Sequence, residues 1–152
     1  MTGAPYRDSI HIDAAPRVVF EYFVDPASLV CWMGDHAILD ARPGGRFILF
    51  FEERAVEGRY VEIDPPRRVV ITWGRRRSAT FPPETSTLEV TLMPEGNGTR
   101  VTIVHSGLPS EELDRHVAGW CHYLARLAVV ATGASAEPHR TPEHLTRGVE
   151  DA

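Results

Sequence analysis

The stretch SEELDRHVAGWCHYLARLAVVATG, residues 110–133, decides the fold. Its apolar residues recur in alternating steps of four and three, which places them on one stripe of an α-helix. The stripe consists of Leu113, Val117, Trp120, Leu124, Leu127 and Ala131. Ser110 suits an N-cap, two glutamates follow in the first turn, and Gly133 suits the residue that ends a helix. An apolar stripe of this width needs another element to cover it.

The chain before this helix has mainly the two-residue periodicity of β-strands. Proline-started helical patterns over residues 16–24 and 26–33 are the exceptions, and Asp25 can cap the second. Strands are predicted over residues 9–13, 37–41, 46–51, 54–63, 67–73, 86–93 and 99–106. The Glu95-Gly96-Asn97-Gly98 sequence is typical of a hairpin turn, and Gly58 within a strand indicates a close approach of another group. Strands joined by hairpins predict an antiparallel sheet.

Composition limits the function classes. A chain of 152 residues suits one domain, predicted over residues 1–133 with a partly mobile tail over 134–152 and a short helix over 141–147. The net charge of −5 argues against nucleic-acid binding, and the absence of lysine excludes Schiff-base chemistry. Cys31 and Cys121 are expected in the core. Neither a leader pattern nor a membrane-length apolar run occurs, so a soluble, cytoplasmic protein without membrane contact is expected.

Several short segments, in this order, carry a resemblance to a known family. They are Trp32, 43–47 (PGGRF), Gly58 with 62–66 (EIDPP), 70–73 (VITW), 98–102 (GTRVT), 105–109 (HSGLP), 119–120 (GW) and 124–127 (LARL). Together they resemble the START-like helix-grip (SRPBCC) superfamily, and within it the bacterial single-domain homologues of the activator of the heat-shock protein 90 ATPase. The likeness spans roughly residues 7 to 133.

The resemblance implies an α+β helix-grip fold. In this fold a curved antiparallel sheet of six to seven strands wraps around the long C-terminal helix, with two short helices after the first strand. It also implies an apolar cavity between sheet and helix, which in many members holds a lipid, sterol, hormone or polyketide. Chaperone-activating members carry an additional N-terminal domain, for which this chain is expected to have no room. Because one fold hosts many functions, function has to be inferred from the site.

The sequence contains no metal or cofactor motif, and no cofactor is predicted. His116 and His122 lie six residues apart on the helix, a spacing that does not favour shared metal ligation. His105 and Ser106 are adjacent on a strand and therefore point to opposite faces. The three arginines 75–77 are expected to form a solvated loop tip, and Asp40, Glu52 and Glu53 to be solvated strand ends. No catalytic residue is assigned.

The cavity candidates are the large apolar residues and the few polar ones expected on the inner face. They are Trp32, Phe47, Leu49, Trp73, Val90, Ile103, His105, His116, Trp120, Tyr123 and Leu124. His105 is expected mainly to hold the corner between strand and helix, whereas Trp120, with His116 and Tyr123 on the helix shoulder, is the expected pocket wall. Leu113 and Val117 are expected in the plain core.

Three functions remain open from the sequence. The favoured one is binding of a small apolar molecule between sheet and helix without established catalysis. The second is an enzyme like a polyketide cyclase or aromatase, with His105, Tyr123 or an inward carboxylate as acid or base. The third is a stress-linked co-chaperone or protein-interaction module, including a homodimer through the outer face of residues 46–51.

Overall fold

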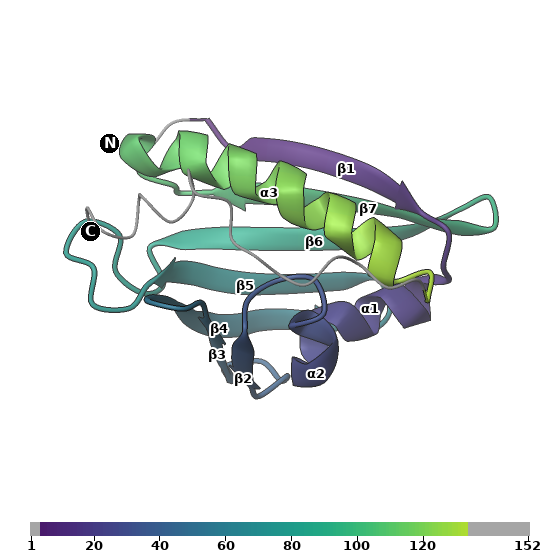
Figure 1. Ribbon diagram of the computed structural model, residues 1–152, viewed down its shortest axis with the longest axis horizontal. Coiled ribbons are helices and arrows are strands. Elements are labelled where there is room, and N and C mark those ends of the chain that lie inside the picture. Colours follow the sequence, from purple (N-terminus) through teal and green to yellow (C-terminus); the bar gives the residue numbers. More distant parts are fainter. Residues whose placement is uncertain (1–3, 134–152) are drawn as a thin grey trace.

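The computed structural model describes residues 4–133, which form one curved sheet with a long helix lying along one of its faces (Figure 1). The strands are β1 (Tyr6–Ile12), β2 (His36–Leu39), β3 (Arg46–Phe50), β4 (Ala55–Asp64), β5 (Arg68–Arg75), β6 (Ser86–Glu95) and β7 (Gly98–Ser106). All neighbours pair antiparallel in the order β1-β7-β6-β5-β4-β3-β2. The long helix is α3 (Ser110–Val130). This is the α+β helix-grip architecture predicted from the sequence.

Two short helices follow β1 and lie beside the C-terminal end of α3 (Figure 1). Helix α1 (Pro16–Val24) buries Val19, Phe20 and Phe23, and the side chain of Asp25 caps α2 (Pro26–Leu29) by accepting a hydrogen bond from the Ser28 amide at 3.0 Å. The second helix is shorter than the predicted 26–33, because the chain continues as turns after Leu29. Trp32 and Met33 in those turns are nevertheless buried.

The turn chemistry of the sheet agrees with the sequence. Strands β6 and β7 are joined by the two residues Gly96 and Asn97, with Gly96 at a positive φ of 59°. Gly58 lies where β4 crosses close to β5, and a Cβ there would collide with the carbonyl group of Thr72. A larger residue at position 58 would therefore force the two strands apart.

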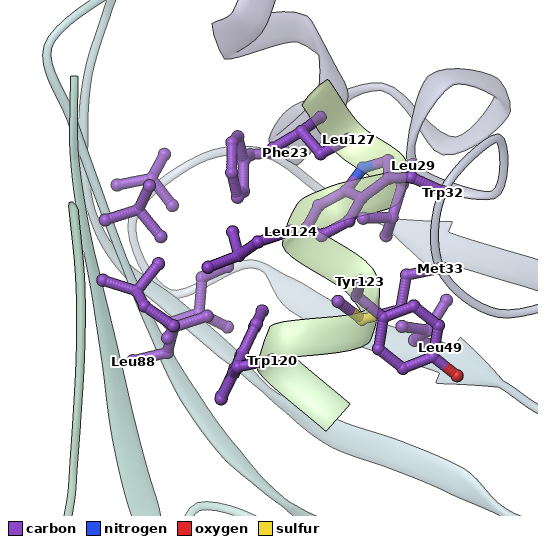
Figure 2. Packing of buried hydrophobic residues seen from close by; sticks show 14 of the residues in the cluster. Phe23, Leu29, Trp32, Met33, Leu49, Leu88, Trp120, Tyr123, Leu124 and Leu127 are labelled. Carbon is purple, nitrogen blue, oxygen red and sulfur yellow. The ribbon is translucent and has the colours of Figure 1, made fainter. Parts of the chain in front are cut away.

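Helix α3 is rotated relative to the predicted stripe. Trp120, Leu124 and Leu127 are buried as expected, but Leu113 and Val117 are only half-buried. The buried face instead continues through Glu112, Gly119 and Tyr123. Figure 2 shows Trp120 and Leu124 directed from α3 towards Leu88 on β6, with Tyr123 on the side of Met33 and Leu49. His116 and Tyr123, expected on the shoulder, therefore belong to the covered side of the helix.

The helix begins differently from the prediction. Pro109, not Ser110, is the N-cap residue, and no side chain caps the first turn. Gly133 has the left-handed φ of 89° that its position predicted, although the helix itself ends at Val130. The predicted short helix over 141–147 lies outside the described residues.

Three surface features correct or limit other expectations. Cys31 and Cys121 are exposed, not in the core. On the outer face of β3, Ile48 is only 1% exposed and the half-buried Phe50 stacks on His36, so this face offers less free apolar surface than the 46–51 pattern suggested. No helix within residues 4–133 is long and apolar enough to cross a membrane.

Candidate functional site

A pocket lies between the first half of α3 and the sheet. Its cavity volume is about 60 Å³. The whole empty space between the atoms of the pocket, including the part that is open to solvent, is about 570 Å³. Five aromatic side chains form much of the wall, two of them from α3: Phe51, Trp73, Phe81, Trp120 and Tyr123. Met33, Val56 and Gly119 also line it. Aromatic walls of this kind offer a large apolar area at little cost in conformational entropy.

A smaller space adjoins the pocket deeper in the core. It has a cavity volume of about 10 Å³, room for about one water molecule, and shares Met33, Trp73 and Trp120 with the larger pocket. Trp32 and Phe47 line it on the far side. The indole of Trp32 is fixed there, since its Nε1–H donates to the Tyr22 carbonyl at 3.0 Å. Met33, Trp73 and Trp120 thus form a wall that the two spaces share.

One wall of the pocket carries a buried ion pair. Nη1 and Nη2 of Arg75, the last residue of β5, donate to Oε1 and Oε2 of Glu112 at 3.2 and 2.9 Å, with side-chain exposures of 7% and 2%. Arg115, one turn further along α3, adds a bond to Oε2 at 2.8 Å. The expectation that Arg75 belongs to a solvated loop tip is therefore wrong. Arg76 and Arg77 are exposed as expected, and Arg76 pairs with Glu57 at 3.1 Å.

His105 joins the helix to the sheet through a chain of hydrogen bonds. The Trp120 indole N–H donates to Nδ1 of His105 at 3.1 Å, so Nδ1 is unprotonated and Nε2 carries the hydrogen. Nε2 donates to Oγ of Ser86 at 2.8 Å, and the Ser86 hydroxyl donates to the Trp73 carbonyl at 2.7 Å. Burial, with a smaller contribution from His116, lowers the pKa of His105 well below its ordinary value. His105 is a neutral, fully bonded residue at the strand-to-helix corner.

His116 lies edge-on to His105 and Phe81, with ring centroids 5.2 and 5.3 Å away. Its Nδ1–H donates to the Glu112 carbonyl at 3.0 Å, which leaves the lone pair on Nε2. Burial lowers its pKa to about 4, despite the opposing effect of the Glu112 backbone and carboxylate. The imidazole therefore presents a neutral acceptor to the pocket at pH 7.

Arg54 is the third arginine of the pocket. Its guanidinium lies 4.4 Å from the centre of the Phe51 ring, and no carboxylate of the described residues lies within 4 Å of it. Burial is the main reason that its pKa is lowered from the usual value. An arginine placed this way is only partly compensated by the ring quadrupole.

The predicted cavity residues divide into three groups. Trp73, His116, Trp120 and Tyr123 line the larger pocket, and Trp32 and Phe47 line the smaller one. The remaining five are packed into the core and line neither space: Leu49, Val90, Ile103, His105 and Leu124. Asp40, Glu52 and Glu53 are exposed, as expected.

The charged residues of the pocket escaped the sequence analysis. The sequence pattern predicts only that Glu112 lies in the first helical turn, and it does not mark Arg54 or Arg115 as pocket residues. A signal for Glu112 was present, because it lies four and eight residues before His116 and Trp120 and hence on the same side of the helix. Arg75 had no such signal, since its partner lies 37 residues away in the sequence.

Sequence comparison assigns the chain to a family. A family model described as "Activator of Hsp90 ATPase homolog 1-like protein" matches residues 13–132, most of the chain. The chain belongs to this family. No curated protein matches it at a significant level.

Solved structures of AHSA1-like and related proteins share the fold. With the AHSA1-like protein of Rhizobium etli the identity is 35%, the TM-score 0.69, and the coverage 95% of this chain and 97% of the other. An HSP90 activator of Plasmodium falciparum has an identity of 25% and a TM-score of 0.71, and the match covers 84% of this chain and 96% of the other. DynU16, a protein of the dynemicin biosynthetic locus, has an identity of 22% and a TM-score of 0.76, and the match covers 91% of this chain and 51% of the other. The last likeness concerns the fold alone.

Proposed function

We propose that this AHSA1-like protein binds a small, largely apolar molecule in the pocket between α3 and the sheet. The observation that carries the proposal is the aromatic-walled pocket under Trp120, open to solvent at one side and placed where the helix-grip fold would hold a ligand. The cavity is small compared with common ligand sites, which are about 300–1,000 Å³. A compact ligand, or movement of a wall, is therefore part of the proposal.

Binding has better support than proton-transfer catalysis. Both carboxylate oxygens of Glu112 are occupied by arginines, and both ring nitrogens of His105 are bonded. His116 keeps a free lone pair, but with a pKa of about 4 it is a weak base at neutral pH. A cyclase-like reaction would have to use one of these groups or Tyr123, the remaining acid or base candidate of the pocket lining. The co-chaperone and homodimer alternatives stay predictions, because the pocket residues bear on small-molecule binding and not on a protein partner.

Native mass spectrometry of the protein purified from the organism that encodes it tests the proposal. Val56→Phe fills the pocket from β4, because Val56 lines it and is 8% exposed. Val61→Phe makes the same change on the same strand at a position that is 53% exposed. We expect a retained small molecule in the wild type and Val61→Phe and its loss in folded Val56→Phe. A wild type without any bound molecule, or equal retention in both variants, would overturn the proposal.

A further inference from the structure

The pocket carries an excess of positive charge. Its ionisable residues are Arg54, Arg75 and Arg115 against the single carboxylate of Glu112, and His116 is neutral at pH 7. Three cations and one anion leave a formal charge of +2 in a site whose other walls are mostly apolar. The chain as a whole has the opposite sign, with a net charge of −5. The excess is therefore a local property of the pocket.

Arg54 is the one arginine of the pocket lining that does not bond Glu112. Arg75 and Arg115 both bond Glu112, whereas Arg54 packs on Phe51 with no carboxylate of the described residues within reach. Arg54 is half-buried, and removing part of a guanidinium from water without an anion is unfavourable unless another group compensates it. The position favours an anion supplied from outside the chain.

Two buried donors of the pocket lining also lack an acceptor within the described part of the chain. These are Nε of Arg75 and Nε1 of Trp73, both inaccessible to solvent. Buried N–H groups are nearly always paired in folded proteins, so each indicates a missing acceptor. An oxygen-bearing ligand group would offer a negative charge to Arg54 and, after a shift of the pocket wall that opens these donors to it, acceptors to both.

We infer that the ligand of this pocket is a carboxylic acid with an aromatic or compact apolar body, its carboxylate held beside Arg54 and Arg75 and its body against the aromatic wall. The inference rests on the proposed function and deepens it. A carboxylate fits better than a larger polyanion, because the cavity of about 60 Å³ is small and Glu112 already neutralises part of the charge. Guanidinium groups bind planar carboxylates with charge-assisted bonds.

The test compares phenylacetate with its neutral isostere phenylacetamide by NMR. The protein has three tryptophans, whose indole N–H signals resolve the site: Trp73 and Trp120 line the pocket, and Trp32 does not. We expect millimolar phenylacetate to shift the Trp73 and Trp120 signals and to bind at least about tenfold more tightly than phenylacetamide, the effect of one charge-assisted hydrogen bond.

Arg54→Gln serves as the diagnostic variant, because it removes the cation outside the ion-pair network. Arg46→Gln is the matched control, an exposed arginine of β3 that does not line the pocket. We expect Arg54→Gln to lose most of the preference for acid over amide while Arg46→Gln keeps it. Equal binding of acid and amide to the wild type would overturn the inference and leave the proposed pocket intact. If neither probe moves the Trp73 and Trp120 signals, the inference is overturned, and the native mass spectrum alone decides the proposed function.

Discussion

Arg75 and Glu112 form a two-bond ion pair that ties the end of β5 to the first turn of α3, with nine-tenths or more of each side chain buried. Two opposite charges can be buried as a pair in a low-dielectric interior, but removing one of them leaves the other buried and uncompensated. The pair therefore has two roles in this fold. It fixes the start of the long helix, and its carboxylate offsets one of the three positive charges of the pocket wall.

Glu112→Gln is expected to lower the free energy of unfolding by about 3–5 kcal/mol, the usual effect of leaving one buried charge unpaired. Urea unfolding of the variant and the wild type measures the change. Glu111→Gln, the same substitution at the exposed neighbouring position, should change stability by less than about 0.5 kcal/mol. Equal losses in the two variants would contradict a buried pair.

His105→Leu is expected to lower the free energy of unfolding by about 1–3 kcal/mol, because the Trp120 indole N–H loses its acceptor. The Trp120 indole signal should shift and exchange faster with solvent in the same variant. The control is His36→Leu, on the exposed first residue of β2. An unchanged Trp120 signal would show that the His105 bond is absent in solution.

Stability is expected to fall as the pH drops from 6.5 towards 4. The folded state holds His116 at a pKa of about 4, below the ordinary 6.5, so in this window the unfolded chain binds more protons and acid favours unfolding. The contribution of His116 amounts to about 3 kcal/mol over the window, and the lowered pKa of His105 acts in the same direction.

Urea unfolding at several pH values, with His116→Gln beside the wild type, isolates this contribution. The variant should have a shallower fall in stability between pH 6.5 and 4, whereas His36→Gln should follow the wild type. Parallel pH curves for His116→Gln and the wild type would refute the assignment of a lowered pKa to His116.

Gly58→Ala is expected to destabilise the protein by more than about 1 kcal/mol, since the added Cβ would collide with the Thr72 carbonyl on the neighbouring strand. Val61→Ala, at an exposed position of the same strand, provides the comparison in thermal unfolding. A neutral Gly58→Ala would mean that β4 and β5 separate there at little cost.

The sequence was sufficient for the features that depend on local chemistry. The Gly96-Asn97 hairpin, the Asp25 cap and the close approach at Gly58 all follow from which residues tolerate which backbone geometry. The antiparallel sheet followed from hairpin-length connections, and the family resemblance supplied the helix-grip arrangement.

The features that the sequence did not reveal depend on distant contacts. A charged residue is ordinarily exposed, so nothing local marks Arg75 and Glu112 as buried partners. The rotation of α3 about its axis, which covers Tyr123 and leaves Val117 half-buried, is decided by packing against the sheet and not by the helical period alone. Cys31 lies in a surface turn and Cys121 on the exposed side of α3, because a small apolar residue is tolerated at the surface as well as in a core.

The bonds along α3 also determine which side of the pocket can move. Glu112 and Trp120 join the first half of α3 to β5 and β7. Near the end of the helix, Arg126 donates to the Trp32 carbonyl. These bonds hold the helix in place along its length. The short turn from Phe51 to Arg54 also lines the pocket, and in it the Phe51 amide donates to the Arg54 carbonyl. We expect a ligand larger than the present cavity to be admitted by displacement of this turn while the helix stays in place.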